Sequence, residues 1–191
     1  MKYKRAFTVV ELLISLSIFV VMTSLVVAKY GNFNQSVLLT NLSYDIAIII
    51  RTAQAYGLSV KAASDSDFTE TAFNYAYGVH FDTDTTNDKN KEIILFADTN
   101  SNGIYDASGD IKIGSSYFIK RGAYIKTLYS SGTPHNTGTM DISFKRPDPN
   151  SNICYNTTCG ESSARIVVLG TDGSTRSVEV YKNGQISVKD E

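Results

Sequence analysis

The chain has 191 residues, of which 18 are basic and 19 acidic, and its net charge of −1 argues against nucleic-acid binding through bulk charge. This length is enough for one domain with a hydrophobic core and one additional element. Three basic residues, Lys2, Lys4 and Arg5, lie at the extreme N-terminus. The remainder holds 15 basic and 19 acidic residues, so the body of the chain is mildly acidic.

A long apolar segment follows the basic start. No charged residue occurs from Leu12 to Ala28, and the stretch from Phe7 to Ala28 is long enough to cross a bilayer as a helix. Glu11 is the exception within it. Because a carboxylate in hydrocarbon is costly, this residue is predicted to be functional.

The helix is predicted to continue beyond the apolar segment, to about Ser59. Gly31, Asn32 and Asn34 weaken a helix, but no proline ends it there. Apolar residues then recur at helical spacing and form one stripe: Leu38, Leu42, Ile46, Ile49, Ala53 and Tyr56. The second half of the helix is therefore expected to carry a globular domain on one side.

The pattern after Ala62 is that of β-strands separated by turn residues. The predicted strands are 75–81, 92–97, 110–119, 123–129, 140–145, 164–170, 174–182 and 184–189. Asp172-Gly173 and Asn183-Gly184 are hairpin signals, and the alternation around Val178 and Val180 predicts an antiparallel sheet with one apolar and one wet face. All three prolines are expected to lie between strands.

The two cysteines, Cys154 and Cys159, are either free thiols or a small surface disulfide loop. An N-terminal export signal favours the disulfide. Zinc is disfavoured, since the only histidines are His80 and His135.

The stretch RAFTVVELLISLSIF, from Arg5 to Phe19, resembles the class III signal of type IV prepilins and type II secretion pseudopilins. The resemblance implies a leader that ends at Ala6, where the family usually has Gly, and cleavage before Phe7. It also implies N-methylation of Phe7. Glu11 is then the fifth residue of the mature chain, as the family pattern requires.

The resemblance implies an assembly role. Glu11 would pair with an α-amine, its own or a neighbour's, and so set the register of packed helices. The implied partners are prepilin peptidase, other pilin or pseudopilin subunits, an inner-membrane assembly platform and the membrane itself. The chain would span the cytoplasmic membrane once, with its globular domain outside, before it enters a periplasmic or extracellular filament.

The body of the chain more loosely resembles the GspH/FimT-like minor pilins and pseudopilins, through YGVHF, the loop after ILFA, ISFKRPDP and a closing hairpin. The expected fold class is α+β and pilin-like, with a long N-terminal helix packed on a C-terminal antiparallel β-sheet domain. The expected divisions are a leader (1–6), a transmembrane helix (7–30), its amphipathic continuation (31–60) and a β-rich domain (61–191). Some FimT-like proteins bind DNA through a basic C-terminal region, but this chain ends in SVKDE, so charge does not support DNA as a partner.

Three alternatives remain open. Small residues before Lys29 also fit an ordinary signal-peptidase site, which would release a secreted protein, and a plain membrane anchor would leave Glu11 unexplained. The globular part, secreted or at a filament tip, is alternatively a module that binds DNA or a surface.

The segment 98–110, DTNSNGIYDASGD, has metal-ligand spacing. Asp98, Asn100, Asn102 and Asp106 match positions 1, 3, 5 and 9 of an EF-hand-type Ca²⁺ loop, and Asp110 falls one residue after position 12. The competing interpretation, slightly favoured, is a turn in which the same side chains bond to the backbone.

No known catalytic motif occurs in the chain. His80 lies in a strand pattern and His135 in a polar loop, neither beside a recognisable nucleophile. The sequence therefore predicts a structural protein and not an enzyme.

Overall fold

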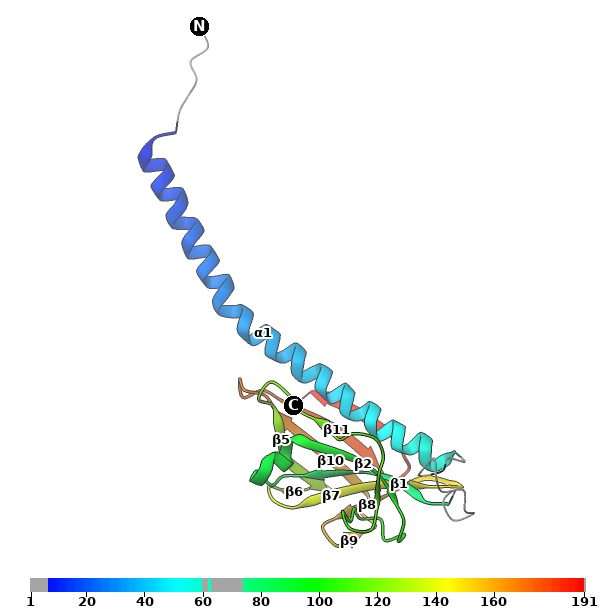
Figure 1. Ribbon diagram of the computed structural model, residues 1–191. Helices are drawn as coiled ribbons and strands as arrows, with labels where there is room; N and C mark the ends of the chain where they lie inside the picture. The colour runs from blue at the N-terminus through cyan, green and yellow to red at the C-terminus, as the bar shows by residue number, and fades with distance from the viewer. Residues whose placement is uncertain (1–6, 60–61, 63–73, 191) are drawn as a thin grey trace.

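The computed structural model describes residues 7–59, 62 and 74–190. One helix dominates it: α1 (Val9–Leu58) runs without a break through Gly31 and the neighbouring asparagines. At 1.5 Å per residue its 50 residues extend for about 75 Å. The first half projects away from the β domain, and the second half lies along it (Figure 1).

The two halves of α1 differ in exposure. Side chains from Val9 to Ala28 are all exposed, whereas the second half buries one face against the domain. The buried line is Leu39, Leu42, Ile46, Ile50, Ala53 and Gly57. The predicted stripe was therefore right at Leu42, Ile46 and Ala53 but displaced elsewhere, because Leu38, Ile49 and Tyr56 are only partly buried.

The described part of the β domain contains two antiparallel sheets and one 3₁₀ helix, η2 (Thr86–Lys91). The first sheet has the order β3-β2-β1-β7-β8-β9, and β4 also pairs with β2. Its strands are β1 (Ala76–Asp82), β2 (Glu92–Asp98), β3 (Ile111–Lys112), β4 (Tyr117–Phe118), β7 (Thr139–Lys145), β8 (Asp148–Tyr155) and β9 (Thr158–Cys159). The second sheet has the order β12-β11-β10-β5-β6. Its strands are β5 (Tyr124–Ser130), β6 (Thr133–His135), β10 (Ser163–Leu169), β11 (Thr175–Tyr181) and β12 (Ile186–Asp190).

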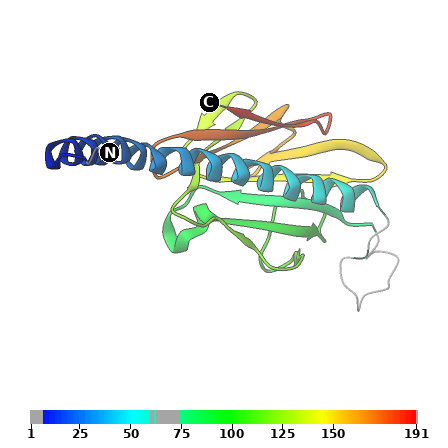
Figure 2. The ribbon, with the colours of Figure 1, turned by 90° about the horizontal axis from the view of Figure 1, so that it is seen from above.

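Helix α1 covers the line along which the two sheets meet (Figure 2), and it contacts β1 and β7 of the first sheet and β11 and β12 of the second. One hydrophobic core joins the three parts, with Ile46 and Ile50 from α1, Phe144 from β7 and Ile166 from β10 all almost fully buried. This arrangement confirms the predicted α+β, pilin-like fold class.

Strand prediction succeeded for the regular strands and failed at the short or proline-containing ones. The hairpins at Asp172-Gly173 and Asn183-Gly184 are present as β10–β11 and β11–β12, and both glycines have a positive φ. However, β6, β8 and β9 were missed, and the predicted strand 110–119 is two short strands, β3 and β4.

The prediction that all prolines lie between strands was wrong for two of them. Pro134 lies in β6 and Pro149 in β8. Both are tolerated because, in the described part of the chain, neither has a neighbouring strand on one side, where a backbone N–H would otherwise be needed as a donor. Strand β6 is at the edge of its sheet, and β9 pairs only with the far end of β8.

The wet face predicted for β11 also needs correction. Ser177 is completely buried, although it alternates with Val178 and Val180. On the same face Glu179 is paired with Arg165 and Lys189, so long charged side chains lie over this part of the sheet.

Candidate functional site

The N-terminal half of α1 is the first candidate site. Val9–Ala28 is 20 residues long and apolar enough to cross a membrane, and none of it is buried against the domain. Ser15, Ser17 and Thr23 each donate a hydrogen bond to a backbone carbonyl of the preceding turn. Their hydroxyls are thus satisfied within the helix, which is the condition for such residues in hydrocarbon.

Glu11 has a role in the structure that the sequence analysis did not identify. Its Oε2 accepts hydrogen bonds from the backbone N–H and the hydroxyl of Thr8, at 3.0 and 2.9 Å, while the Thr8 hydroxyl accepts from the Glu11 N–H at 3.2 Å. This is a capping box at the start of α1. The Thr-x-x-Glu spacing signals it in the sequence.

The predicted processing site is only partly within the described residues. Phe7 is 82% exposed just before the helix, and Ala6 lies outside the described part of the chain. Cleavage before Phe7 would leave both Thr8 and Glu11 on the mature chain, so it would preserve the residues of the capping box. The pairing of Glu11 with an α-amine stays a prediction.

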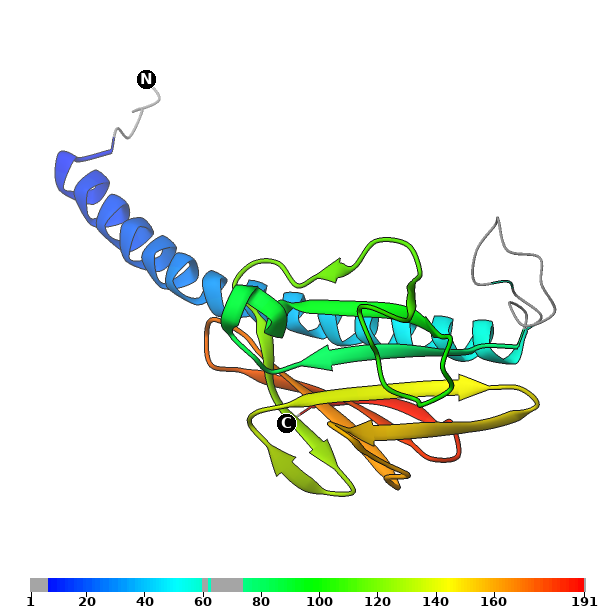
Figure 3. The same ribbon diagram turned by 60° about the horizontal axis from the view of Figure 1, so that its bottom comes forward.

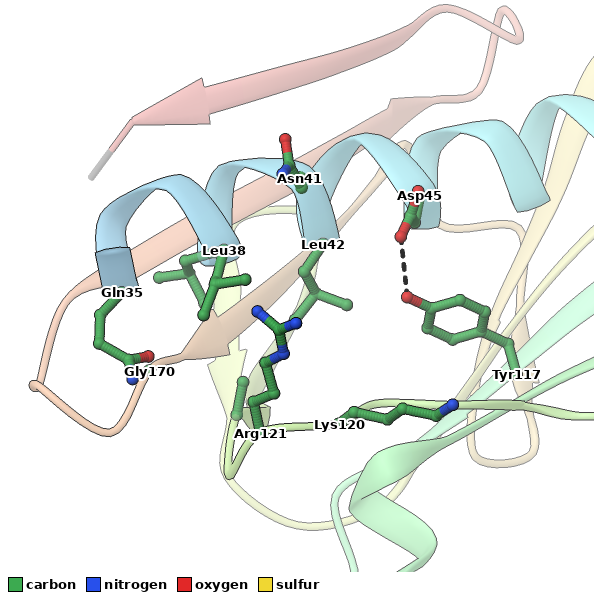
Figure 4. Close-up of a pocket in the computed structure, with 11 residues that line it drawn as sticks. Gln35, Leu38, Asn41, Leu42, Asp45, Tyr117, Lys120, Arg121 and Gly170 are labelled. Atoms are coloured by element: carbon green, nitrogen blue, oxygen red, sulfur yellow. Dashed lines mark hydrogen bonds between the residues drawn. The ribbon is translucent and has the colours of Figure 1, made fainter. Parts of the chain in front are cut away.

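A second candidate lies where α1 meets the near end of the β domain. A cavity of about 190 Å³ is lined by α1 residues from Gln35 to Asp45 and by Tyr117 and Arg121. Figure 4 shows Arg121 extending towards α1 and the Tyr117 hydroxyl meeting Asp45. That hydroxyl donates to Asp45 Oδ2 at 2.9 Å and so fastens β4 to the helix.

The surroundings of Tyr117 also change the pKa of its hydroxyl. Partial burial, together with the hydrogen bond to Asp45 and the negative charge of that carboxylate, raises the pKa of Tyr117 to about 12. The phenol therefore stays protonated as a donor over the whole physiological range.

The 98–110 loop uses its polar side chains on its own backbone. Asn100 accepts from the Asn102 N–H, and Asn102 accepts from the Ile104 N–H. Asp106 accepts from the backbone and hydroxyl of Ser108, and these hydrogen bonds lower the pKa of its carboxyl from the ordinary value. This is the Asx-turn arrangement of the competing interpretation.

The remaining two loop carboxylates close and anchor the loop. Asp110 accepts from the N–H groups of Thr99 and Asp106, which ties the two ends together. Asp98 is 1% exposed, and its Oδ2 accepts from the Gly103 N–H at 2.8 Å. Within the described residues no group of three or more His, Cys, Asp or Glu side chains is placed to hold a metal ion. The Ca²⁺ site stays a prediction.

A buried pair behind this loop was missed by sequence reasoning. His80 Nδ1 lies 2.7 Å from Oδ1 of the fully buried Asp141, which also accepts from the Tyr105 N–H at 3.2 Å. The Tyr105 ring packs against His80 and Phe96. The pair thus holds the loop onto the outer face of the first sheet. Since β1 and β7 meet only in the fold, no local signal reveals it.

Cys154 and Cys159 form a disulfide between β8 and β9. Cys154 is fully buried, and the Cys159 sulfur lies 3.8 Å from the Asn102 carbonyl oxygen, so the bridge is packed beneath the same loop.

Residues 1–27 match the family model described as the prokaryotic N-terminal methylation motif. No curated protein and no solved structure matches the chain. The fold and the N-terminal site thus define a pilin-like α+β protein with a prepilin-type signal. Motif and apolar helix together support the type IV pilin family, although they do not extend to the GspH/FimT-like group. They indicate a structural subunit.

Proposed function

We propose that the protein is a minor pilin or pseudopilin, a structural subunit of a type IV pilus-like or type II secretion filament. The observation that carries the proposal is the continuity of α1. A single helix joins a fully exposed apolar half to a half that is built into the domain core.

This design supports insertion followed by assembly. The apolar half is stable in a bilayer, and the same surface suits packing among other apolar helices once the subunit leaves the membrane. The basic leader favours a cytoplasmic N-terminus, which puts the β domain on the outer side. Prepilin peptidase, other pilin subunits and an inner-membrane assembly platform are the partners that this proposal requires.

The mature N-terminus tests the proposal. Mass spectrometry of the protein purified from its native membrane should find a chain that starts at N-methylated Phe7. A chain that starts at Lys29 would show ordinary signal-peptidase cleavage and remove the apolar half on which assembly depends. A chain that retains Met1 in cells with active prepilin peptidase would also contradict the proposal.

A further inference from the structure

A polar cavity lies at the end of the β domain farthest from the apolar half of α1. It has a volume of about 360 Å³ and is formed where β2, β7 and β8 meet the 98–110 loop. The β7–β8 hairpin points to the same end of the molecule as the C-terminus of α1 (Figure 3). Thirty residues of helix separate Ala28 from Leu58, so this end lies about 45 Å from the proposed membrane segment.

Two ammonium groups and two carboxylates, those of Asp98 and Asp148, line the cavity, so its formal charges balance. Lys145 and Lys182 line it, both are exposed, and neither forms a salt bridge within the part of the chain that the structure describes. Lys145 Nζ instead lies 3.4 Å from the hydroxyl of Ser101, on the opposite wall. Asp148, which also lines the cavity, accepts hydrogen bonds from the backbone and side-chain amides of Asn150. The two lysines are therefore available to an anion.

One carboxylate of the cavity lining has an oxygen without a hydrogen-bond partner in the described part of the chain. Asp98 lines it, and although its Oδ2 bonds to Gly103, its Oδ1 is buried without a hydrogen-bond partner among the described residues. A buried unpaired oxygen is costly, and a donor from a ligand would remove that cost. A simple anion would offer no donor to Asp98 Oδ1, and a bare cation would offer no acid group to the two lysines.

We propose that this cavity binds an acidic sugar, a ring that carries hydroxyl groups beside a carboxylate or phosphate. A hydroxyl donates to Asp98 Oδ1, and the acid group pairs with Lys145 and Lys182. Its volume is at the lower end of the range for small-molecule sites, which suits a single sugar unit. The site faces away from the membrane, where a surface polysaccharide would be met, and it does not rest on filament assembly.

Calorimetry on the full chain in phosphatidylcholine nanodiscs tests the proposal, without sugar-based detergents. Glucuronate and glucose 6-phosphate are the probes that combine both features, and the better binder identifies the acid group. Glucose and acetate each carry one feature. We expect binding in about the millimolar range for at least one acidic sugar and about tenfold weaker binding for glucose and acetate. Equal affinity for acetate, or no binding of either acidic sugar, would overturn the proposal.

Variants locate the binding. The double variant Lys145→Ala, Lys182→Ala and the single variant Asp98→Asn should each weaken acidic-sugar binding about tenfold. Lys126→Ala, an exposed lysine on β5 outside the cavity, is the matched control and should leave affinity unchanged. The lysine pair is exposed, so that variant should fold even if Asp98→Asn disturbs the loop. Unchanged affinity in the folded lysine variant would refute the site.

Discussion

At the scale of single residues, a close approach between two backbones decides which side chain a position can hold. Gly57 is buried near the end of α1, and a Cβ added there would collide with the Phe144 carbonyl oxygen of β7. The Gly57 carbonyl in turn accepts from the Arg146 N–H at 3.0 Å. The helix and the sheet touch here with no room for a side chain.

Gly57→Ala should therefore destabilise the protein by about 1–3 kcal/mol, because the contacting atoms are backbone and cannot rotate away. Urea unfolding of the full chain in nanodiscs, followed by tyrosine fluorescence, measures the effect. Gly109→Ala is the control, since its added Cβ would be 3.6 Å from Asp106 Oδ2, at an ordinary contact distance. Equal stability of the two variants would show that α1 does not approach β7 so closely.

Whether the 98–110 loop binds Ca²⁺ depends on the hydrogen bonds that its individual side chains already make. The loop is held together without a metal, because Asn100, Asn102 and Asp106 accept hydrogen bonds from its own backbone. We expect calorimetry with Ca²⁺ to give no saturable heat. A saturable heat that Asp106→Ala abolishes would instead establish the predicted metal site.

At the scale of elements, the side of α1 that faces the domain determines its contribution to stability. Ile50 is fully buried in the core, whereas Ile48, two residues earlier, is 58% exposed. Ile50→Ala should lower the free energy of unfolding by about 2–5 kcal/mol. Ile48→Ala, the same chemical change on the outer face, should alter it by no more than about 0.5 kcal/mol.

These two variants are compared by the same urea unfolding measurement. A similar loss in both would mean that the outer face of α1 is also covered in the isolated chain.

The Tyr117–Asp45 hydrogen bond joins β4 to α1, and its pH dependence follows from the raised pKa. A group whose pKa rises on folding contributes stability that is fully present below its unfolded value, here 10, and is lost as the pH increases towards 12. Tyr117→Phe should lower stability by about 0.5–1.5 kcal/mol at neutral pH. It should also reduce the loss of stability between pH 10 and 12, measured by urea unfolding across that range. An identical alkaline loss in the variant would exclude Tyr117 as its source.

At the scale of the whole molecule, the observed role of Glu11 and its proposed role can be separated. It caps α1 within the chain, and the proposed function gives its charge a second role in pairing with an α-amine. Glutamine at the same place can also complete a capping box, but it carries no charge.

Glu11→Gln should therefore form a normal α1 yet enter the filament about tenfold less than the unmodified chain, because no charge selects the packed register. Glu11→Ala, which loses both roles, should be incorporated no better. The measurement is the amount of each variant that co-purifies with the filament. Normal incorporation of Glu11→Gln together with loss of Glu11→Ala would assign Glu11 to capping alone.

Local patterns in the sequence predicted the features that depend on neighbouring residues. The apolar run, the prepilin-type motif, the continuation of the helix and the Asp172-Gly173 and Asn183-Gly184 hairpins are all local patterns, because helix period and turn chemistry are properties of a few adjacent residues. The fold class followed from them.

Features that depend on residues far apart in the chain became apparent only from the folded arrangement. The buried line of α1 is displaced from the predicted stripe, since two sheets and not the helix alone determine which side is covered. The His80–Asp141 pair and the cavity between Asp98 and Lys145 join strands that meet only through the pairing of β1, β2 and β7. Such contacts arise from long-range packing, which leaves no period in the sequence.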